Sequence, residues 1–175
     1  MSRHREILGL TNHKPSVDKG CFVAPTAGVS GEVALGAGSS VWYGAFVKGD
    51  RSKVTIGTNT NVMEGAVIQG GAGPVKIGNN ATIGVGMCPH HNTAAYYMFV
   101  LMLLLRLILL LRGAGAVIGA ATIGNNANIG IKAFVGDGAV VEDGAAVAAG
   151  SYVAKGTKVP AGSLFGGNPA VFIEP

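Results

Sequence analysis

An aliphatic residue returns at every sixth position along most of the chain. The longest uninterrupted column of such residues has eight members, and shorter columns of the same period precede it. The long column is Val117, Ile123, Ile129, Val135, Val141, Val147, Val153 and Val159; the shorter ones are Val23, Val29, Leu35, Val41 and Val47, then Ile56, Val62 and Ile68, then Ile77 and Ile83. Gly, Asn and Asp recur between these positions and tolerate tight corners. A six-residue period of this kind predicts an all-β chain folded as a parallel β-helix.

Each hexad corresponds to one short strand and one corner, so that three hexads form a triangular coil. The marked positions predict about six coils, and at roughly 4.8 Å per coil the prism would be about 29 Å tall. Gly contributes 29 of 175 residues and only 13% of the chain is charged, which is typical of a solenoid rather than a disordered chain. We predict one β-helix domain over residues 15–173, preceded by an N-terminal extension, residues 1–14.

The hexad register breaks most strongly between Ile83 and Val117. If Pro89 occupies one further hexad site, about 22 residues are extra, and we assign the insertion to residues 92–114. Its centre, residues 94–111, is almost entirely apolar, and as a helix it would span about 27 Å.

A single membrane span is not expected for this insertion, because the β-helix resumes afterwards and both ends must return to one coil. A bent helical excursion against a membrane surface or a hydrophobic partner fits better, with packing on the prism itself as the alternative. The residues expected to make this contact are Tyr96, Phe99, Leu103, Arg106, Leu107 and Leu110.

Charge and cysteine content exclude some classes of protein. The net charge is +4 without a basic cluster, which argues against a nucleic-acid partner. Cys21 and Cys88 are too few for a disulfide framework, so a reducing compartment is expected and both thiols are interpreted as small buried hydrophobes.

Three segments in a fixed order carry a more specific signal. They read SVWYGAFVKGD over residues 40–50, IGTNTNV over residues 56–62 and GSLFGGNPA over residues 162–170. Together they resemble γ-class carbonic anhydrases, over roughly residues 15–173 without the insertion. The resemblance implies a left-handed β-helix that assembles as a trimer; the hexad period does not determine this hand. In such enzymes three histidines from two subunits hold a Zn²⁺, which activates water for attack on CO₂.

The resemblance places the three zinc-ligand positions at Gln69, Val85 and His90. Only His90 is a histidine, and it is interpreted as a remnant ligand because Gln69 is a weak donor and Val85 is none. Met63 stands where the family usually has a Gln near the metal-bound water, so a supporting hydrogen bond is lost as well. We therefore expect a degenerate site without catalysis and no cofactor in this chain, with zinc restricted to an interface between other subunits.

Lys48 and Asp50 match an Arg and an Asp that pair across the trimer interface in the family. Lys keeps the positive charge but loses the two-pronged guanidinium, so a weaker pair is expected. An ordinary surface ion pair is the equally weighted alternative.

These features predict a non-catalytic structural subunit that forms a trimer with two γ-carbonic-anhydrase-like subunits. The insertion would dock this trimer on hydrophobic subunits of a membrane complex, or on lipid. Related proteins occupy the matrix side of mitochondrial respiratory complex I, so the resemblance implies the mitochondrial inner membrane, with the cytoplasm as the alternative location. Two enzymatic functions stay open: a γ-type carbonic anhydrase with altered ligands, drawn from Cys88, His90 and His91, and a hexapeptide acyltransferase with a His as general base.

Overall fold

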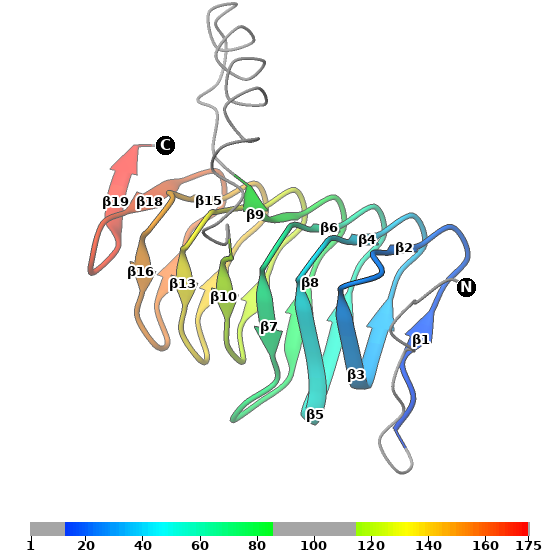
Figure 1. Cartoon of the computed structure of the whole chain (residues 1–175). Helices are drawn as coiled ribbons and strands as arrows, with labels where there is room; N and C mark the ends of the chain where they lie inside the picture. The colour runs from blue at the N-terminus through cyan, green and yellow to red at the C-terminus, as the bar shows by residue number, and fades with distance from the viewer. Residues whose placement is uncertain (1–12, 86–114, 175) are drawn as a thin grey trace, which may run out of the picture.

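The coils form a triangular prism of short parallel strands (Figure 1). The structure is a computed structural model that describes residues 13–85 and 115–174. Every regular element in these ranges is a β-strand. Within the same ranges no helix is long and apolar enough to cross a membrane.

Three faces make up the prism, and each is a ladder of strands from successive coils. The first face contains β2 (Phe22–Val23), β4 (Ser40–Val41), β6 (Asn61–Val62), β9 (Thr82–Val85), β12 (Asn128–Gly130), β15 (Ala146–Val147), β18 (Leu164–Gly166) and the antiparallel β19 (Val171–Glu174). The second face contains the first halves of β3 (Gly28–Leu35) and β5 (Phe46–Ile56), then β7 (Val67–Gln69), β10 (Val117–Ile118), β13 (Phe134–Val135) and β16 (Tyr152–Val153).

The third face completes each coil. It contains β1 (Ser16–Val17), the second halves of β3 and β5, then β8 (Val75–Ile77), β11 (Thr122–Ile123), β14 (Val140–Val141) and β17 (Lys158–Val159). Six coils are therefore complete on all three faces, with β1 before them and β18 beginning a seventh. The predicted all-β, parallel β-helix and its number of coils are confirmed.

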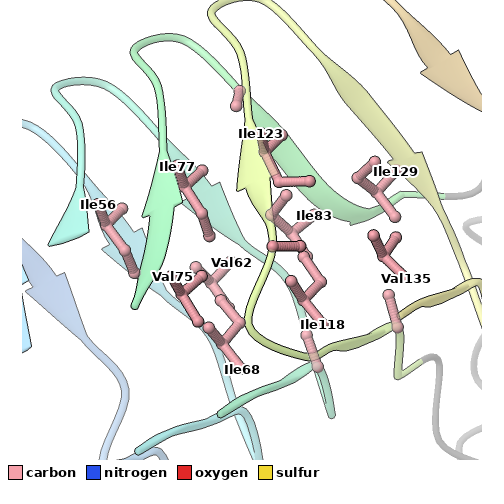
Figure 2. Packing of buried hydrophobic residues seen from close by; sticks show 14 of the residues in the cluster. Ile56, Val62, Ile68, Val75, Ile77, Ile83, Ile118, Ile123, Ile129 and Val135 are labelled. Carbon is pink, nitrogen blue, oxygen red and sulfur yellow. The ribbon is translucent and has the colours of Figure 1, made fainter. Parts of the chain in front are cut away.

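The inner positions of the strands stack into one continuous aliphatic core along the prism axis (Figure 2). All but two of the predicted inward residues are buried; Val23 is half-buried, and Val117 is 39% exposed. Ile118 occupies the core in place of Val117, in register with Ile68 below it and Val135 above it. The prediction for Val117 was wrong because the corner between Ile118 and Ile123 is one residue shorter than the regular hexad.

Asn and Asp side chains form a hydrogen-bonded ladder along the corner between the third and first faces. The Oδ1 atom of Asn79 accepts from the Thr58 N–H at 2.8 Å, and that of Asn125 accepts from the Asn79 N–H at 2.8 Å. Asp143 continues the ladder by accepting from the Asn125 N–H at 2.7 Å. Asn80 and Asn126, which follow the ladder residues, have φ values of 53° and 54°. The Gly-Asn-Asn motifs thus supply both the capping acceptor and the left-handed corner residue.

Lys132 occupies a left-handed corner between the first and second faces, with φ of 55°. The same corner one coil later has Gly150, with φ of 69°. Because Lys lacks the conformational freedom of Gly in this region, Lys132→Gly is expected to raise the free energy of unfolding by about 0.5–1 kcal/mol. Urea denaturation would measure this gain. The control is Gly150→Ala, whose added Cβ meets no neighbour within 4 Å and which should be destabilising through backbone strain alone; a loss of stability in Lys132→Gly would contradict the prediction.

Glu142 and Lys158 form an exposed ion pair on neighbouring coils, with 2.7 Å between Nζ and Oε1. The hydrogen bond from Lys158, followed by that from the Ala161 N–H, lowers the pKa of Glu142. The contribution of this carboxylate to stability is therefore present above its unfolded pKa and is lost as pH falls through the lowered folded pKa. Glu142→Gln should reduce the difference in melting temperature between pH 6 and pH 3, as thermal scans can measure, and a variant with the unaltered difference would contradict this.

The chain interrupts the fourth coil at the corner between the first and second faces. Ile83 in β9 and Ile118 in β10 are 35 residues apart, whereas Val62 and Ile68, one coil earlier, are six apart. Among the described elements, β10 follows β9 on the next face and pairs directly with β7; Pro89, considered as a further hexad site, lies outside the described residues. The predicted insertion, residues 92–114, and its six proposed contact residues lie outside the described residues.

Candidate functional site: a degenerate ligand position on the second face

Met63 and Val85 lie beside the corner between the first and second faces, whereas Gln69 lies at the far end of its strand on the second face. Gln69 is the last residue of β7 on the second face, and its side chain is exposed. Met63 follows β6 at the corner that leads to this face, and its N–H donates to the Ile83 carbonyl at 2.9 Å. Val85 ends β9. His90 lies outside the described residues, as do Cys88 and His91.

Lys48 and Gln69 are register partners on adjacent coils of the second face, and Ser30 is the partner of Lys48 on the coil before. The Lys48 Nζ is 3.9 Å from the Asp50 Oδ2, and Ser30 Oγ donates to Asp50 Oδ1 at 2.9 Å. Lys48 also lies over the Phe46 ring, 5.6 Å from its centroid. A pairing of Lys48 and Asp50 within the chain is thus available, although their side chains are 40% and 35% exposed and such a pair contributes little to stability.

The donor atoms at these positions do not suit zinc. Gln69 offers a neutral amide and Val85 a hydrocarbon, whereas structural and catalytic zinc sites use imidazole, thiolate or carboxylate ligands. Across residues 13–85 and 115–174, no group of three His, Cys, Asp or Glu side chains lies close enough to hold a metal ion. The described residues alone therefore do not supply the set of zinc ligands.

Glu64 is a feature of this corner that sequence reasoning missed. Its Oε2 is a buried oxygen that has no hydrogen-bond partner among residues 13–85 and 115–174. An unpaired buried carboxylate oxygen costs free energy unless a donor reaches it. The acidic residue in the otherwise apolar and small-residue segment Val62–Val67 was the available signal.

Comparisons with known proteins identify relatives of two kinds. No protein-family model matches the chain. Mitochondrial γ carbonic anhydrases 3 and 2 of Arabidopsis thaliana are 52% and 50% identical to it over 50 residues, which is 29% of this chain. The matched region spans less than a fifth of the length of these curated relatives, 19% and 18%.

Two solved structures match almost the whole chain. A hexapeptide transferase family protein from Anaplasma phagocytophilum has a TM-score of 0.75 and 31% identity, with 95% of this chain and 81% of that chain covered. A predicted acetyltransferase from Bacillus cereus has a TM-score of 0.76 and 25% identity, with 95% and 80% covered.

The coils, corners and relatives together define the class of protein as a left-handed β-helix of hexapeptide repeats. The handedness expected from the resemblance is thereby confirmed. The chain belongs to the hexapeptide transferase family and is γ-carbonic-anhydrase-like within it.

Proposed function

We propose that this chain is a non-catalytic, γ-carbonic-anhydrase-like structural subunit. It assembles with two related subunits into a trimer and docks on a membrane complex. The observation that supports the proposal most directly is the donor set of the degenerate site, where Gln69 and Val85 stand at two of the three ligand positions. Any zinc in the assembly would then belong to an interface between the other two subunits.

The proposed location is the matrix side of the mitochondrial inner membrane, on respiratory complex I. The γ carbonic anhydrases that match the chain are mitochondrial proteins. The apolar composition of residues 94–111 supports a hydrophobic docking partner, either a membrane subunit or lipid. The identity of the complex rests on the family resemblance.

Two enzymatic functions are the alternatives to a structural role, and the purification described below distinguishes them. The presence of Cys88, His90 and His91 in sequence keeps a γ-type carbonic anhydrase with altered ligands open, because thiolate and imidazole are good zinc ligands. The whole-chain similarity to a predicted acetyltransferase keeps acyl transfer open.

Native purification tests the proposal. The chain, expressed at its natural level, would be isolated from its membrane, its co-migrating proteins identified by mass spectrometry, and zinc counted per chain in the same sample. We expect co-migration with related β-helix subunits and a membrane complex, with less than one zinc per chain. A free homotrimer with one zinc per chain and CO₂ hydration activity would establish the carbonic anhydrase instead, and acetyl transfer from acetyl-CoA would establish the transferase.

A further inference from the structure

We draw no further inference here: the strongest candidate, the free edge of β19 at the C-terminal end of the first face, where Val171, Phe172 and Ile173 are exposed, carries none, because nothing in the structure shows what covers this apolar strand.

Discussion

Replacement of Ile118 by Ala is expected to lower the free energy of unfolding by about 2–5 kcal/mol. The Ile118 side chain is fully buried between Ile68 and Val135 in the stacked core, so its truncation leaves a cavity that the neighbouring coils cannot close. Val117→Ala should cost less than about 1 kcal/mol, because this side chain is 39% exposed. Urea denaturation at one fixed protein concentration would measure both values.

Val117 and Ile118 are successive residues of β10, so the two substitutions also test which of them faces the core. An uninterrupted hexad count would place Val117 inside the prism and Ile118 outside. A larger loss of stability for Val117→Ala than for Ile118→Ala would therefore contradict the structure at this coil. Equal losses would contradict it as well, because only one of two successive residues in a strand can face the core.

Conversion of two ligand positions to histidine, Gln69→His with Val85→His, is expected to raise zinc affinity at least about 100-fold. Structural zinc sites derive roughly 10–16 kcal/mol from four ligands, so each added imidazole contributes on the order of 3 kcal/mol. Metal competition against a chromophoric chelator, with zinc counted by mass spectrometry, would measure the change. We expect the natural chain to bind weakly and the double variant to approach one zinc per chain.

The third family ligand position provides the control for this gain. His90→Ala, added to the double variant, should return zinc affinity close to that of the natural chain. If the double variant forms a homotrimer, so that each site receives ligands from two copies, and still gains no affinity, the assignment of Gln69 and Val85 to ligand positions is wrong. If the natural chain already binds zinc tightly, the altered-ligand carbonic anhydrase becomes the better account of its function.

The hexad period was sufficient to predict the strands and most of the core, because each strand and its corner together take six residues, so that the inward side chains recur at this interval. Motifs such as Gly-Asn-Asn marked corners for a reason that the structure shows: the first Asn caps the previous coil and the second adopts a left-handed conformation. The short corner before Ile123 carries no comparable mark. Val117 was therefore assigned to the core by extending the count backwards, and that assignment failed.

The outward positions of the second face were harder to predict from the sequence than the core. They include Val67, Val117, Phe134 and Tyr152. Phe134 and Tyr152 are 18 residues apart, but the chain between Val67 and Val117 contains the interruption of the fourth coil, so the register between these two residues depends on the pairing of β7 with β10. The burial of the Glu64 Oε2 was likewise not predictable from the sequence, because it depends on packing at a corner. The site positions of Gln69 and Val85 came from family resemblance, which periodicity alone does not supply.

The interruption of the fourth coil has a consequence for how this chain can change over evolutionary time. The Val67 N–H donates to the Ala116 carbonyl at 2.8 Å, and Ile118 pairs with Ile68 immediately afterwards, so the strands on both sides of the break keep their partners. The entropy of closing a loop grows only with the logarithm of its length, and doubling the excursion would cost about 0.6 kcal/mol. A segment inserted at this corner can thus become longer or shorter, or change in sequence, at little cost to the prism, whereas the strands on both sides of the break must keep their mutual register.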